Sequence, residues 1–220
     1  MSVRSLSPGR NNALLTALGQ VIAAILLLGV SVRAPGASDQ ELDAAYKQGS
    51  KLLEPYLVLS DRPARDATTR DARAQILEGI RLLSTVTEAK PENWAAFWLM
   101  GKGHQSLRDH VAAEGAFKRS YAINPTHRDV ARELMIESIC TGHTGAAVAV
   151  AEDIARLNPR DAGLAANLGL AYLADGQLTK ARSATERALQ LDPEDRITRG
   201  LLSEVVSVQG GRKPSKYCPP

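Results

Sequence analysis

The sequence predicts an all-α chain of stacked helix pairs, and three observations support this fold class. Four prolines, Pro91, Pro125, Pro159 and Pro193, follow one another at intervals of 34 residues. Three of them come directly after Asn or Asp, and such dipeptides are typical of turns. Other positions keep the same register, which indicates repeat units that bury their apolar faces against one another.

The clearest repeat unit runs from Ala162 to Asp195. Small residues, Gly169 and Ala181, stand where two antiparallel helices must approach closely, and Gly176 ends the first helix with a residue that readily adopts positive φ. The remaining register positions are Leu168, Tyr172, Ala188 and Pro193. This pattern resembles the tetratricopeptide repeat (TPR) family. The resemblance implies an all-α, TPR-type helix-turn-helix solenoid.

The same register divides the rest of the chain. Residues 94–127 and 128–161 are two further units, so three TPR units cover 94–195. Residues 39–91 form a degenerate N-terminal helical pair, with one helix over Gln40–Glu54, stopped by Pro55, and a second over Thr69–Ala89. An amphipathic helix over 196–208 is the solvating cap that a solenoid needs at its end. Residues 209–220 are expected to be a disordered tail.

Residues 13–32 are expected to form a transmembrane anchor. They carry no charge, and about 20 helical residues span roughly 30 Å, the thickness of a hydrocarbon core. Arg4 and Arg10 precede the segment and acidic residues follow it, which predicts a cytoplasmic N-terminus over 1–12. Arg outnumbers Lys 19 to 8, as is common in GC-rich bacteria. We therefore expect a single-pass protein of a bacterial inner membrane, with its repeats in the periplasm; a cleaved signal peptide is the alternative.

Composition excludes several functional classes. The net charge of +3 comes from the two ends of the chain, where residues 1–33 and 212–220 carry six basic residues and no acidic one. The folded part is therefore net negative, which argues against a nucleic-acid-binding surface. Two cysteines are too few for a zinc finger or a disulfide scaffold. We expect no cofactor and no metal site.

No catalytic constellation of nucleophile, base and oxyanion donors is visible, so we do not expect an enzyme. Cys140 and His104 are expected to pack in the structure, while Cys218 is expected to be a solvated thiol, with an intermolecular disulfide as the alternative. The remaining candidates are expected at the surface: His110, His127, and the carboxylate pair Glu133 and Glu137.

The first helix of each TPR pair faces a concave groove in which partners bind. Transferred to this chain, the resemblance selects a partner-binding groove made of Trp98, Lys102, Gln105, Asp129, Arg132 and Ile136. The groove positions of the third unit are Gly163, Ala166, Leu170 and Leu173, so the groove is expected to have an aromatic and cationic end and an apolar end. Trp98 is equally a candidate for packing against the preceding helix.

The resemblance implies a protein or peptide ligand and protein–protein interaction as the function. We expect a membrane-tethered scaffold or assembly factor. Two alternatives stay open: an accessory subunit of a membrane enzyme or cytochrome c maturation system, and a secreted periplasmic TPR binding protein.

Overall fold

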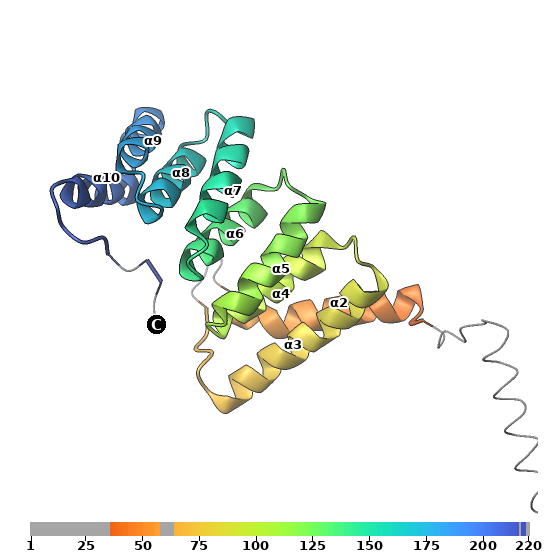
Figure 1. Ribbon diagram of the computed structural model, residues 1–220. Coiled ribbons are helices and arrows are strands. Elements are labelled where there is room, and N and C mark those ends of the chain that lie inside the picture. Colours follow the sequence, from red (N-terminus) through yellow and green to blue (C-terminus); the bar gives the residue numbers. More distant parts are fainter. Residues whose placement is uncertain (1–35, 58–63, 216, 219–220) are drawn as a thin grey trace, which may run out of the picture. The chain divides into compact units, whose positions relative to one another are not determined.

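The computed structural model describes residues 36–57, 64–215, 217 and 218. The regular secondary structure of the described residues is all helical, and the helices follow one another as antiparallel pairs (Figure 1). The bounds are α2 (Asp39–Leu53), η1 (Glu54–Tyr56), α3 (Arg70–Ala89), α4 (Trp94–Ser106), α5 (His110–Ile123), α6 (Arg128–Cys140), α7 (Thr144–Leu157), α8 (Ala162–Ala174), α9 (Leu178–Leu191) and α10 (Arg196–Gln209).

The expected membrane anchor, residues 13–32, lies outside the described residues. None of the helices in the described part is long and apolar enough to cross a membrane. Residues 1–37 and 38–220 form separate units, and the following description concerns the second unit.

The first helix of each repeat unit, like α10 after them, begins with a side-chain cap, and these caps recur every 34 residues. Asn93, His127, Asp161 and Asp195 each accept a hydrogen bond from a backbone N–H of the first turn, at 2.9–3.4 Å. Each cap satisfies one of the amide groups that a helix N-terminus leaves without a partner. His127, expected to be solvated, therefore has a structural role at the start of α6.

The turn within each pair also recurs every 34 residues. Arg108, Gly142 and Gly176 all have positive φ, at 59°, 82° and 76°. Gly adopts this conformation freely, whereas an L-residue pays about 1–2 kcal/mol. The first unit therefore keeps the repeat geometry even though Arg108 replaces the usual glycine.

The two helices of a pair cross at a position where side-chain volumes are complementary. Gly101 faces Phe117, and a Cβ atom added at Gly101 would lie 2.5 Å from the Phe117 ring. Gly169 faces Thr185 with equally little room. In the middle unit the large residue is on the first helix and the small one on the second. Met135, which is 1% exposed, belongs to the same buried cluster as Ala151.

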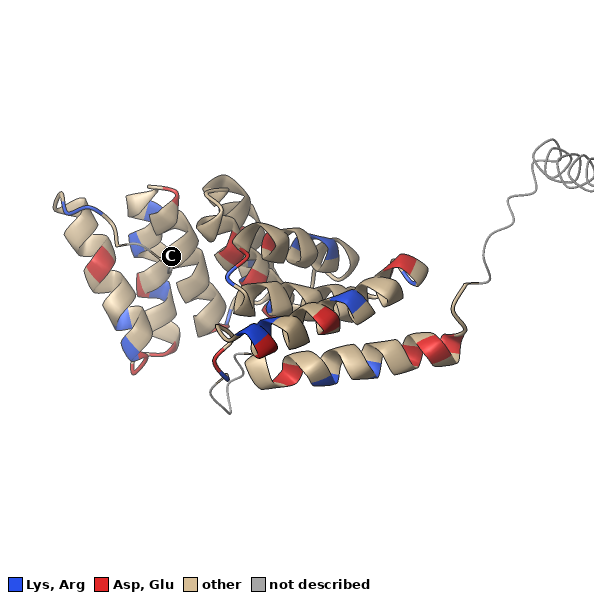
Figure 2. Ribbon diagram, turned by 90° about the horizontal axis from the view of Figure 1, so that it is seen from below, with Lys and Arg blue, Asp and Glu red and all other residues tan. Residues whose placement is uncertain are grey.

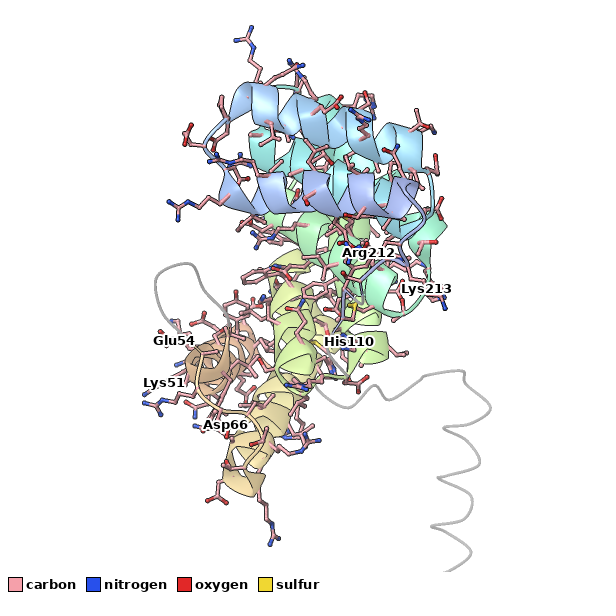
Figure 3. The ribbon with its side chains drawn as sticks, turned by 90° about the vertical axis from the view of Figure 1, so that its left-hand side faces the viewer. Lys51, Glu54, Asp66, His110, Arg212 and Lys213 are labelled. Atoms are coloured by element: carbon pink, nitrogen blue, oxygen red, sulfur yellow. A yellow bond between two sulfur atoms is a disulfide. The ribbon has the colours of Figure 1, made fainter. Side chains whose placement is uncertain are left out.

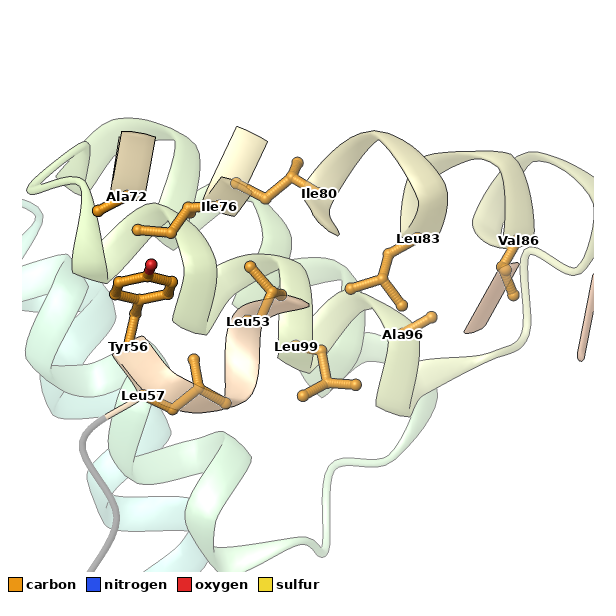
Figure 4. Close-up of a cluster of buried hydrophobic side chains, with 10 residues drawn as sticks. All are labelled: Leu53, Tyr56, Leu57, Ala72, Ile76, Ile80, Leu83, Val86, Ala96 and Leu99. Carbon is orange, nitrogen blue, oxygen red and sulfur yellow. The ribbon is translucent and has the colours of Figure 1, made fainter. Parts of the chain in front are cut away.

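The N-terminal pair packs on the first repeat through its own apolar cluster (Figure 4). α2 and α3 approach closely, since a Cβ atom at Gly49 would lie 3.0 Å from the Gly79 carbonyl oxygen. Tyr56 in η1 donates a hydrogen bond to Gln75 Oε1 at 2.6 Å, and its carbonyl accepts one from Ser106 at 2.8 Å. These bonds fix η1 beside the C-terminal end of α4.

Candidate protein-binding cleft

A cleft of about 900 Å³ opens between α4, α6 and the segment that follows η1. Its walls include all six residues that the sequence selected for the groove. Trp98, Lys102 and Gln105 come from α4, and Asp129, Arg132 and Ile136 from α6. The third wall is the segment 64–68, which includes the exposed Arg65 and Asp66. The structure thus brings the six residues together; their role in binding stays a prediction.

A buried polar network connects α4 to α6 under the cleft. Lys102 Nζ lies 3.3 Å from Glu133 Oε1, and these residues are 6% and 5% exposed. Gln105 Nε2 donates to Glu133 Oε2 and to Glu137 Oε1, both at 2.8 Å. His110 Nδ1 lies 2.8 Å from Glu137 Oε2. Lys102 thus contributes to the floor of the cleft, with its ammonium paired to Glu133.

The network keeps Glu133 ionised. Burial by itself raises the pKa of Glu133, but Lys102, the Gln105 amide and the Arg132 guanidinium outweigh it, so the pKa lies below the ordinary value of 4.5. Arg132 reaches Glu133 Oε1 at 3.0 Å from the solvent side. A buried carboxylate with several hydrogen-bonding partners and two cations is stabilised in its charged form.

The groups that stay accessible lie at the rim. The side chains of Arg132 and Asp129 are 46% and 58% exposed. Trp98 is half-buried, and it packs against the apolar clusters on both sides of α4. Trp98 therefore both lines the cleft and packs against the preceding helix. Its Nε1 atom is buried and has no hydrogen-bond partner among the described residues.

The comparisons with known proteins agree with this architecture. A sequence model of the tetratricopeptide repeat matches residues 162–195. The solved structure "MamA 41-end from Desulfovibrio magneticus RS-1" is 21% identical with a TM-score of 0.62, and the match covers 79% of this chain and 88% of that one. The chain has the fold of a tetratricopeptide-repeat protein. A second structure, "Crystal structure of MamA protein", is 18% identical with a TM-score of 0.57, covering 79% and 90% of the two chains. A comparison with curated proteins gave no match.

The burial of Glu133 and Glu137 was predictable from the repeat register. The prediction of a surface carboxylate pair is wrong, since both are almost fully buried. Glu137 stands one period from Gly103 and Ala171, and Glu133 stands one period after Leu99; these three residues are buried. Comparing tetratricopeptide units position by position, rather than spacing along one helix, identifies both carboxylates as interior. His110, also expected in solvent, is half-buried because it contacts Glu137.

The apolar end of the tetratricopeptide groove is covered by the C-terminal tail. The expectation of disorder over 209–220 fails for the described tail residues, because Cys218 forms a disulfide with Cys140. Tyr217, Leu170 and Ile139 all pack against the same buried apolar cluster of the C-terminal repeats. The expectation of a solvated Cys218 thiol is therefore wrong as well, and the bond is intramolecular.

One cluster has the composition of a metal site. Ligand atoms of His110, Glu137 and Cys140 lie within 4.8 Å of one another. Metals bind the thiolate form of cysteine, whereas the Cys140 sulfur is bonded to Cys218. In this state the cluster provides one imidazole and one carboxylate, and the carboxylate already accepts from Gln105 and contacts His110.

Proposed function

We propose that this protein is an interaction scaffold that binds an extended segment of a partner protein in the cleft between α4 and α6. The observation that carries the proposal is the convergence of all six groove positions on one cleft whose floor is already ordered. The network from Lys102 to Glu137 fixes both walls before any ligand arrives. A preorganised site loses less conformational entropy on binding than a mobile one.

The accessible groups define the kind of segment that fits. Trp98 and Ile136 offer apolar surface inside the cleft, while Arg132 and Asp129 offer one charge of each sign at its rim. A partner segment with an apolar side chain flanked by polar groups would complement this pattern. Trp and Arg are also the residues most often found as binding hot spots.

The test compares partner recovery by variants of the full-length chain in mild detergent. Arg132→Ala and Trp98→Ala are each expected to reduce recovery of bound protein at least tenfold. Arg156→Ala is the matched control, because Arg156 pairs with Asp153 three residues earlier just as Arg132 pairs with Asp129. Arg156 does not line the cleft.

Helicity and thermal unfolding are measured for each variant. Trp98→Ala is expected to lower the melting temperature because the ring packs on two apolar clusters, so Arg132→Ala gives the cleaner result. Unchanged recovery with Arg132→Ala and with Trp98→Ala would move the binding surface away from the cleft.

We further propose that residues 13–32 tether the scaffold to a bacterial inner membrane, with the repeats in the periplasm. The uncharged length of the segment supports a tether, and the Cys140–Cys218 disulfide supports an oxidising compartment. A tether raises the effective concentration of the scaffold near membrane partners.

Full-length protein is expected to stay in the membrane fraction after high-salt and alkaline washing. Deleting residues 1–37 is expected to release a helical, soluble fragment. Release of the native chain by alkali, or an N-terminus that begins after residue 33, would contradict the tether.

A further inference from the structure

The C-terminal segment turns back onto the concave surface after α10. Gly211, with φ of 98°, reverses the chain direction, and the Arg212 N–H donates to the Ser207 carbonyl at 3.0 Å. Glu204 then receives two groups of the tail: one carboxylate oxygen pairs with the Arg212 guanidinium, and the other accepts from the Ser215 N–H at 2.8 Å. We call the described tail residues 212–215, 217 and 218 the strap.

The strap lies over the groove positions of the third repeat. Tyr217 and Ser215 line one hollow together with Ala166 and Leu170 of α8 and Leu201 of α10. The ring of Tyr217 contacts the apolar cluster of the C-terminal repeats. About 370 Å³ stays unfilled in this hollow, so the strap covers the apolar surface without packing it to interior density.

The far end of the strap is fixed covalently beside the open cleft. Cys218 is bonded to Cys140, the last residue of α6 (Figure 3). Cys140 lies one helical turn after Ile136 and Glu137, which line the cleft. The strap therefore ends where the accessible part of the groove begins.

The non-covalent contacts of the strap are weak. The Arg212 side chain is half exposed, and surface ion pairs contribute little. The Tyr217 hydroxyl is buried with no partner among the described residues, which offsets part of the gain from its ring. Ordering the segment also costs conformational entropy, and this cost opposes the gain from these contacts. The disulfide is therefore what holds the strap in place.

We infer that the strap is a redox-released occupant of the groove, an inference that rests on the proposed binding function. The reductant is a protein dithiol of the thioredoxin type. One of its thiolates attacks Cys218 Sγ and forms a mixed disulfide, and Cys140 leaves as a thiolate that takes up a proton. The second thiol of the reductant then displaces Cys218. The reductant becomes a disulfide, and this chain gains two thiols through two electrons and two protons.

Release of the strap lengthens the binding surface. In the dithiol form the cleft between α4 and α6 becomes continuous with the apolar wall of Ile139, Ala166 and Leu170. This longer groove suits an extended segment with an aromatic or aliphatic side chain in the place of Tyr217. In the disulfide form, the strap occupies part of this apolar wall and keeps it separate from the cleft.

The test places the photoreactive residue p-benzoylphenylalanine at position 166 of the full-length chain. In the oxidised protein, irradiation is expected to cross-link this position to the strap, as identified by peptide mass spectrometry. Reduction, or Cys218→Ser, is expected to lower the yield of this cross-link at least tenfold. The same probe in place of the exposed Leu157 on α7 is the control, and it is expected to give no strap cross-link in either state.

Two results would overturn the inference: a strap cross-link that persists after reduction, or its absence from the oxidised protein. Hydrogen exchange of α3 is measured in parallel, to show that the reduced chain stays folded. These readouts need no partner, so they can succeed or fail independently of partner recovery with Arg132→Ala.

Discussion

The two ends of the concave surface are stabilised in different ways. At the open end, buried charges of α4 and α6 are partners for one another, and the remaining charges face water. At the other end the walls are apolar, and the chain covers them with its own strap. Figure 2 shows charges of both signs interspersed along the described helices. A satisfied polar surface can therefore stay open, whereas a contiguous apolar one needs an occupant.

Breaking the polar network at the open end should lower stability more than any other change at the two ends. Glu133→Ala leaves the Lys102 ammonium buried without its carboxylate, and such a change typically costs about 3–5 kcal/mol. We expect a loss of this size in the free energy of unfolding measured with urea.

The double variant Lys102→Met with Glu133→Leu is the control for that prediction. Replacing both members of a buried ion pair with apolar residues is often neutral, so this variant should recover most of the stability. A single variant no less stable than the wild type would show that the network is not what supports the open end.

A smaller effect is expected where both ends share the same helix geometry. Gly101→Leu at the open end and Gly169→Leu at the covered end each overpack a helix crossing, and each should cost about 1–3 kcal/mol. In both cases a Cβ atom already meets the side chain of the partner helix. Gly115→Leu is the control, since a Cβ atom at Gly115 meets nothing within 4 Å. Equal melting temperatures for all three variants would contradict the assigned register.

The smallest effect is a pH dependence of the free energy of unfolding, and it comes from residues at the open end. Burial lowers the pKa of His104 below 6.5, with Asp109 opposing the shift, and the pKa of Glu133 lies below 4.5. In both cases the unfolded state binds more protons, so stability falls as pH falls. The free energy of unfolding should decline below pH 6.5 and again below pH 4.5.

His104→Gln should remove the upper step of that decline, whereas Tyr172→Phe at the covered end should keep it. A free energy of unfolding that increases toward acid pH would contradict the sign of both shifts.

Much of the fold was predictable because the signals are local and periodic. Prolines, N-caps and turn residues act within a few positions of themselves, and a period of 34 repeats them. Arg108 stands one period before Gly142 and two periods before Gly176, and its positive φ places it at the same turn of the repeat. The helix predicted over Gln40–Glu54, stopped by Pro55, corresponds to α2 over Asp39–Leu53.

The site was predictable in part. The resemblance to tetratricopeptide repeats selected six residues that do line one cleft, but it could not show that Lys102 pairs with the buried Glu133. The disulfide was missed because 78 residues separate Cys140 from Cys218. Their pairing depends on the path of the tail across the groove, and no local pattern in the sequence specifies that path.

The disulfide also determines how the chain carries mechanical load. It closes a loop of 78 residues that contains α7, α8, α9 and α10. A force applied between the N-terminus and the C-terminus therefore passes from residue 218 directly into α6 and bypasses α7, α8, α9 and α10. The bypassed stretch would extend to about 270 Å if it were pulled out. In the oxidised chain this stretch cannot extend under force, and only the helices up to α6 bear the tension.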